Sequence, residues 1–105
     1  MKKYICIDIG GTAIKHSVTR EDGEIIKMAQ MDTEASKGGL SILEKVKDIV
    51  RNYIIEHKVD GICVSTAGMV DPKEGKIIYA SSLIPNYIGV EIKKELEKEF
   101  KIRCE

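Results

Sequence analysis

One carboxylate stands at the end of the first apolar run of the sequence, immediately before two glycines. In YICIDI, the alternation of a strand places Asp8 on the face opposite the isoleucines. An unpaired carboxylate is costly to bury, so we expect Asp8 where the strand end opens to water, a cation or a hydrogen-bond donor. Gly10 and Gly11 permit a tight turn with accessible backbone N–H groups. With the Thr12 hydroxyl and the Lys15 ammonium group nearby, such a turn can hold phosphate oxygens.

A carboxylate beside a phosphate-binding turn has a natural partner in hydrated Mg²⁺, which prefers oxygen ligands and keeps several waters. Asp8 is therefore a candidate to hold Mg²⁺ through water. An ordinary hairpin, in which GGT is turn chemistry and Asp8 only caps the turn, explains the same residues equally well. The P-loop pattern G-x-x-x-x-G-K-[ST] and the dinucleotide pattern G-x-G-x-x-G are absent from the sequence.

The first half of the chain must supply the elements that position this turn. Residues 4–9, 13–19 and 24–31 are β-rich and separated by turn signals, which predicts three antiparallel strands. From Leu40 onward, apolar residues recur at spacings of three and four, which predicts a helix, and Ser41 with Glu44 has the pattern of a capping box. The apolar positions of this helix are Ile42, Leu43, Val46, Ile49, Val50, Tyr53 and Ile54.

The second half predicts another strand, a hairpin and a second helix. ICVSTAG is a short apolar run that suits a strand covered on both faces, parallel and adjacent to the first strand. DPKEG is a turn signal, with Gly75 free to take positive φ, between GMV and KIIYAS. Ile92, Leu96 and Phe100 form the stripe of a charged helix, on which Glu97 and Lys101 are spaced as an ion pair. KIRCE begins what we expect to be a further strand.

Composition excludes several classes of protein. Seventeen basic and seventeen acidic residues cancel, so the chain lacks the basic field that nucleic acid or an anionic membrane requires. No apolar run approaches the roughly 18 residues of a membrane span, and no signal peptide is recognisable, so we expect a cytoplasmic protein of one domain. Cys6, Cys63 and Cys104 are odd in number and lack C-x-x-C spacing, which argues against a disulfide framework or a zinc site.

Three segments together resemble the N-terminal lobe of ROK proteins, a bacterial family of sugar kinases and repressors: IDIGGTAIKHSV, GICVSTAGMVDPKEGKIIYAS and IPNYIGVEIKKELEKEF. The resemblance implies an α/β, ribonuclease-H-like (actin-like ATPase) domain with a mixed sheet, in which three antiparallel strands precede parallel strands and helices. It also implies that residues 1–105 form the first lobe of a kinase that transfers the γ-phosphate of ATP, with Mg²⁺, to a hexose hydroxyl. Whether the sugar is glucose, N-acetylmannosamine or a β-glucoside stays open.

The resemblance assigns roles to particular residues. Five residues match the family's phosphate motif D-x-G-G-T-x-x-K: Asp8, Gly10, Gly11, Thr12 and Lys15. Ala67 and Gly68 match a sugar-facing turn, and Ser81 matches a position whose hydroxyl meets the sugar in some members. The family's general base is an aspartate that follows the strand begun by KIRCE, so we expect the catalytic base outside residues 1–105 and an isolated chain that is inactive. His16 and His57 match no family ligand; we expect a hydrogen-bonded strand residue and a solvated residue near a helix end.

Two alternatives to a kinase stay open. A sugar-sensing ROK regulator carries a helix-turn-helix before this first strand, and here Met1 lies only three residues before Tyr4. A non-catalytic sugar-binding relative is the other alternative. We also expect a homo-oligomer, because the stripe of Ile92, Leu96 and Phe100 and an unpaired sheet edge would be left exposed in this chain.

Overall fold

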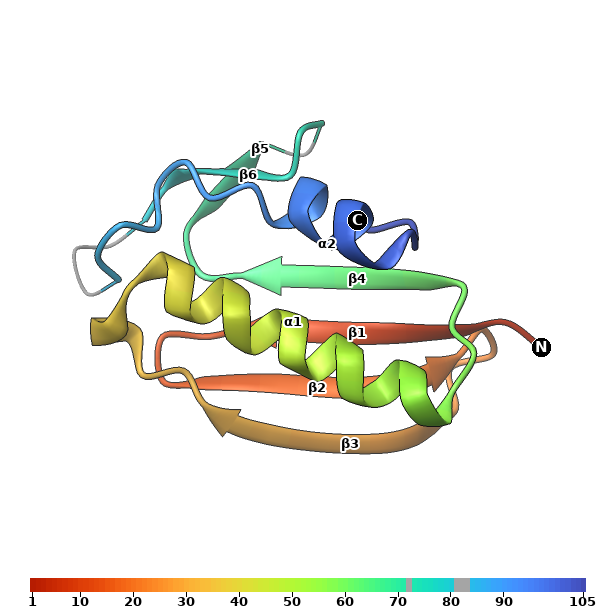
Figure 1. The fold of residues 1–105 in the computed structure, drawn as a ribbon. Helices are drawn as coiled ribbons and strands as arrows, with labels where there is room; N and C mark the ends of the chain where they lie inside the picture. The colour runs from red at the N-terminus through yellow and green to blue at the C-terminus, as the bar shows by residue number, and fades with distance from the viewer. Residues whose placement is uncertain (72, 81–83) are drawn as a thin grey trace.

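The structure is a computed structural model that describes residues 1–71, 73–80 and 84–105. Its elements alternate as the sequence predicts, with three strands, a long helix, a strand, a hairpin and a short helix (Figure 1). Their bounds are β1 (Lys3–Ile9), β2 (Ala13–Arg20), β3 (Ile25–Asp32), the 3₁₀ turn η1 (Ala35–Lys37), α1 (Gly39–Glu56), β4 (Gly61–Thr66), β5 (Met69–Asp71), β6 (Lys76–Tyr79) and α2 (Ile92–Phe100).

The main sheet has the strand order β3-β2-β1-β4. β1 pairs antiparallel with β2 and β2 with β3, whereas β4 runs parallel to β1, so the predicted mixed sheet is confirmed. The end of the chain extends this sheet: the Ile62 N–H donates to the Arg103 carbonyl at 2.8 Å, and the Glu105 N–H donates to the Ile62 carbonyl at 2.9 Å. Residues 103–105 therefore lie beside β4 and pair with it through one parallel bridge, from Ile62 to Cys104, although they do not form a full strand.

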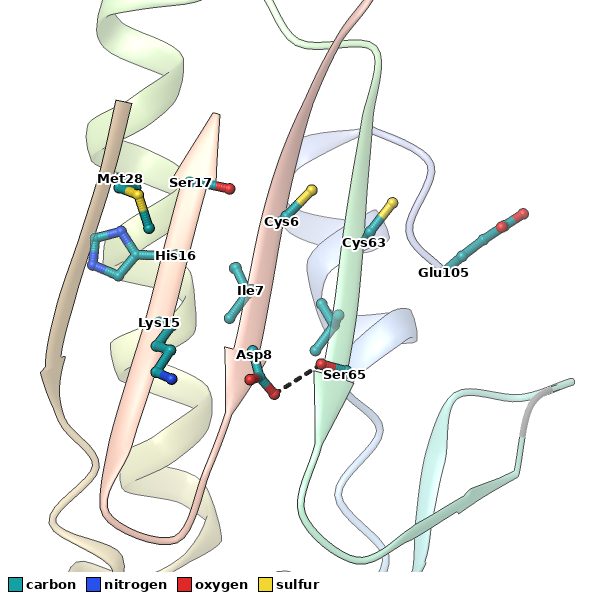
Figure 2. A pocket seen from close by; sticks show the side chains of 11 residues that line it. Cys6, Ile7, Asp8, Lys15, His16, Ser17, Met28, Cys63, Ser65 and Glu105 are labelled. Carbon is teal, nitrogen blue, oxygen red and sulfur yellow. Dashed lines mark hydrogen bonds between the residues drawn. The ribbon is translucent and has the colours of Figure 1, made fainter. Parts of the chain in front are cut away.

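The helices cover one face of the sheet only. In β1, the alternating Ile5, Ile7 and Ile9 are at most 2% exposed, and they join a single core with the buried stripe of α1 and with Leu96 of α2. Both helices lie behind the strands in Figure 2, which looks onto the opposite face. No described element covers that face, which carries the side chains of Asp8 and Lys15. Neither helix in the described ranges has the length and apolar character of a membrane-spanning segment.

The small hairpin forms as predicted, and β4 forms as a strand parallel to β1, but one face of β4 is open. β5 pairs antiparallel with β6, and Gly75 takes φ +66° in the turn between them. A strand covered on both faces was expected at ICVSTAG, but Cys63 and Ser65 of β4 are exposed. The prediction is wrong because both helices pack on the face of β4 that carries Ile62.

Two local predictions at the helices also fail. The Ser41–Glu44 capping box does not form, because α1 begins at Gly39 with Gly38 as its N-cap, and Ser41 lies inside the first turn. Glu97 does not pair with Lys101. Its carboxylate accepts the Cys104 N–H at 3.1 Å, and Lys101 ends α2 in the left-handed region at φ 57°.

The apolar stripe of α2 is covered within this chain. Ile92 is 4% exposed and Leu96 is fully buried in the main core. Phe100 is half-buried, and the Arg51 guanidinium lies over its ring at 5.9 Å. The expectation that this stripe forms an exposed patch is therefore wrong, because α2 turns its apolar side towards β4 and β6.

Candidate functional site

Two turns meet at the carboxyl ends of β1 and β4. The first turn (residues 10–12) joins β1 to β2, and the second turn (residues 67–68) joins β4 to β5. Parallel pairing in the register Ile9 to Thr66 brings them to one edge of the sheet, and the Ala67 N–H donates to the Ile9 carbonyl at 2.8 Å. Gly68 takes φ +100°, a conformation that favours glycine. The predicted parallel and adjacent pairing of these two strands is confirmed, and it places the two turns side by side.

The first turn has the geometry of an anion cradle. The Gly10 N–H donates to the Ala13 carbonyl at 2.9 Å, and a Cβ on Gly10 would lie 2.9 Å from the same oxygen, so only glycine fits there without a shift. Gly11 and Thr12 are exposed, and neither N–H donates to another described residue. Two adjacent free N–H groups at an open turn can bind the oxygens of a phosphate.

Asp8 lies next to this turn, on the open face of the sheet. Its Oδ1 accepts a hydrogen bond from the Ser65 hydroxyl at 2.9 Å (Figure 2). Its Oδ2 accepts no hydrogen bond from a described residue. Lys15 is the partner of Asp8 across the β1–β2 pair and extends over the same face, without forming an ion pair with it. Asp8, Lys15 and Ser65 thus form a polar row across β2, β1 and β4.

This row lines one end of an open groove of about 490 Å³, whose other lining residues include Cys6, Cys63 and Met28. The described ranges contain no group of three or more His, Cys, Asp or Glu residues that could surround a metal ion. A cation at Asp8 would therefore keep most of its waters or take further oxygens from a substrate, which is the usual behaviour of Mg²⁺. The free Oδ2 fits a water-mediated Mg²⁺.

The second turn is backed by a buried tyrosine. The Thr66 hydroxyl and the Tyr87 hydroxyl are 2.5 Å apart, and burial raises the pKa of Tyr87. The loop that carries Tyr87 also meets the start of α1, where the Gly39 N–H donates to the Pro85 carbonyl at 2.9 Å. A Cβ on Gly39 would lie 2.5 Å from the Asn86 carbonyl oxygen, so this contact requires glycine. Ser81, the predicted sugar-facing hydroxyl, lies outside the described residues.

The histidines and cysteines lie apart from the two turns. His16 bonds through Nδ1 to the Tyr53 hydroxyl at 2.7 Å on the helix side of β2, and burial lowers its pKa, so the hydrogen-bonded strand residue is confirmed. His57 directly follows α1, as expected, but its side chain is only 14% exposed, so the expectation of a solvated residue is wrong. Cys6 and Cys63 are neighbours within β1 and β4, and all three cysteines are free thiols.

The sequence pointed to residues of both turns and did not point to two polar residues beside them. It singled out Asp8 and the first turn, and the structure brings them beside Ala67 and Gly68. It did not single out Ser65, whose only signal is that parallel pairing with β1 makes it the partner of Asp8. Tyr87 also escaped it, because no local pattern marks a loop tyrosine as the partner of Thr66.

Comparison with known proteins agrees with this architecture. Residues 4–105 match the ROK family. An uncharacterized protein of Clostridium perfringens is 60% identical over 104 residues, which are 99% of this chain and 35% of that protein. The β-glucoside kinase of Listeria innocua is 35% identical over 97 residues, which are 92% of this chain and 31% of that kinase. The chain thus spans about a third of the length of these relatives.

Solved structures show the same fold. The ROK family glucokinase of Streptomyces griseus, in complex with glucose and AMPPNP, matches with a TM-score of 0.83 over 97% of this chain and 31% of that chain, at 24% identity. The chain belongs to the ROK family and has the ribonuclease-H-like, actin-like fold of that family's sugar kinases.

Proposed function

We propose that this chain is the phosphate-binding lobe of an ATP-dependent sugar kinase. The observation that carries the proposal is the pair of free N–H groups on Gly11 and Thr12, next to the free Oδ2 of Asp8. Phosphoryl transfer depends mainly on positioning and on neutralising charge, and these groups supply both. The β-glucoside kinase among the relatives and the AMPPNP complex among the structures support the choice of sugar and ATP as substrates.

In this proposal the first turn binds ATP and the second turn binds the sugar. The first turn binds phosphate oxygens of ATP through its N–H groups, and Lys15 adds a positive charge on the open face. Asp8 holds Mg²⁺ through water, and Ser65 orients the carboxylate by donating to Oδ1. Mg²⁺ would neutralise charge on the transferring phosphate. Ala67, Gly68 and Ser81 face the sugar, whose hydroxyl accepts the phosphate.

The remaining parts of the proposal concern the whole protein. The base that accepts the sugar's proton lies outside residues 1–105, so this chain alone does not turn over. The protein is cytoplasmic, binds neither nucleic acid nor membrane, and forms a homo-oligomer. The alternative is a protein that binds a sugar without transferring phosphate to it. Kinase activity distinguishes the two.

The test is a kinase assay on a full-length ROK protein that begins with this chain, with MgATP and a panel of hexoses and β-glucosides. Asp8→Asn keeps the shape of the side chain and removes the charge that anchors Mg²⁺, so we expect turnover to fall by at least about 10²-fold with folding intact. Asp48→Asn, at an exposed aspartate on α1, is the matched control and should be unaffected. Full activity in Asp8→Asn would eliminate the assignment.

A further inference from the structure

One buried threonine is bonded to the first turn from behind. Thr33, which directly follows β3, is fully buried, and no other polar side chain among the described residues reaches that degree of burial. Its hydroxyl donates to the Gly10 carbonyl at 2.7 Å, and its N–H donates to the Thr12 carbonyl at 2.9 Å. A buried hydroxyl is costly without a partner, and both donors of Thr33 find their partner in this turn.

These bonds determine which groups of the turn are free. Thr33 occupies the carbonyls of Gly10 and Thr12, and the Gly10 N–H closes the turn on Ala13. The N–H groups of Gly11 and Thr12 are left without a described partner on the exposed side. Because a peptide unit directs its N–H away from its carbonyl, holding the Gly10 carbonyl inward directs the Gly11 N–H outward. Thr33 thereby orients the group that would contact phosphate.

The threonine is in turn fixed to the long helix. Lys45 of α1 donates through Nζ to the carbonyls of Asp32 and Thr33, at 2.9 and 3.0 Å, and to the Glu34 carboxylate at 2.7 Å. Only 14% of the Lys45 side chain is exposed. The position of the first turn therefore depends on α1 through Lys45 and Thr33, as well as on the two strands that the turn joins.

We propose that Thr33 is a positioning residue for the phosphate-binding turn, acting through the Gly10 carbonyl. This inference rests on the proposed function. Removing the hydroxyl should loosen the turn and weaken the binding of Mg·AMPPNP, whereas the stability of the sheet should change little, because the strands and helices keep their contacts. Serine keeps the hydroxyl and should restore binding.

The experiment compares Thr33→Val, Thr33→Ser and the wild type as the 105-residue chain. Titration with Mg·AMPPNP, followed through backbone amide resonances, gives the affinity, and ¹⁵N relaxation gives the order of residues 10–12. We expect Thr33→Val to weaken binding about fivefold or more, the effect of one lost hydrogen bond, and to lower the order of the turn. Thr33→Ser should stay within about twofold of wild type.

A stability control separates positioning from folding. Ile62→Val shortens a buried side chain at the other end of β4 and should lower the melting temperature without changing the affinity for Mg·AMPPNP. If Thr33→Val left both the order of residues 10–12 and the affinity for Mg·AMPPNP unchanged, the role of Thr33 would be overturned and the proposed function would stand. A wild-type chain that does not bind Mg·AMPPNP would overturn the proposed function, and with it any role of Thr33 in binding phosphate.

Discussion

Replacing Gly10 by alanine and replacing Gly11 by alanine should have opposite effects on stability. A Cβ on Gly10 would lie 2.9 Å from the Ala13 carbonyl oxygen, closer than real Cβ atoms approach, and that oxygen also accepts the Gly10 N–H. A Cβ on Gly11 would have no atom within 4 Å. Neither glycine has positive φ, so alanine can adopt the backbone conformation at both positions.

The magnitude follows from three terms. Alanine reduces the entropy of the unfolded chain, which stabilises by about 0.4–1 kcal/mol at a compatible position. At position 10, the methyl group forces a shift that costs about 1–3 kcal/mol, and it weakens a hydrogen bond worth about 1 kcal/mol. Gly10→Ala should therefore destabilise by about 1–3 kcal/mol, whereas Gly11→Ala should be neutral or slightly stabilising.

Urea unfolding of the 105-residue chain measures both variants. A difference of about 2 kcal/mol also corresponds to a difference of about 8–16 °C in melting temperature for a domain of this size. Equal stabilities for the two alanine variants would refute the reasoning, because they would show that the carbonyl of Ala13 does not constrain position 10.

Two further predictions concern other parts of the chain. Lys101 ends α2 in the left-handed region at φ 57°, so Lys101→Gly should stabilise by about 0.5–1 kcal/mol in urea unfolding, whereas Lys98→Gly inside the helix should destabilise by about 1 kcal/mol. Hydrogen bonds from Lys37 and Lys45 lower the pKa of Glu34 from 4.5 to about 2. A lowered folded-state pKa gives stability that is present above pH 4.5 and lost as pH falls towards 2, so Glu34→Gln should flatten the acid limb of a stability–pH profile; an unaltered limb would contradict this.

Local patterns predicted the elements of the fold, because each pattern reports burial directly. The alternation of Ile5, Ile7 and Ile9 and the stripe of α1 depend on which side of one element is covered. The turn at Gly75 depends on one backbone conformation. These features need no knowledge of neighbouring segments, and the structure confirms them, except that Ile54 of the predicted stripe is 37% exposed.

The pairing of β4 with β1 was predicted, but side-chain contacts that depend on the register between distant segments were not. Ser65 gains its role from the register of β4 against β1, and Thr33 gains its role from the close approach of two loops that are 23 residues apart. In the sequence both look like ordinary polar residues near strand ends. The exposed face of β4 was not predicted for a related reason. An apolar run indicates that a strand is buried, but it does not indicate whether helices cover one face or both.

The central claim is that the free N–H groups of Gly11 and Thr12 bind phosphate. It is tested most directly by titrating the ¹⁵N-labelled 105-residue chain with Mg·AMPPNP, with adenosine at the same concentration as the control. We expect the amide resonances of Gly11 and Thr12 to shift most with Mg·AMPPNP and to stay in place with adenosine. The claim would be contradicted if the amide resonances of Gly11 and Thr12 did not move, whether or not other resonances shifted.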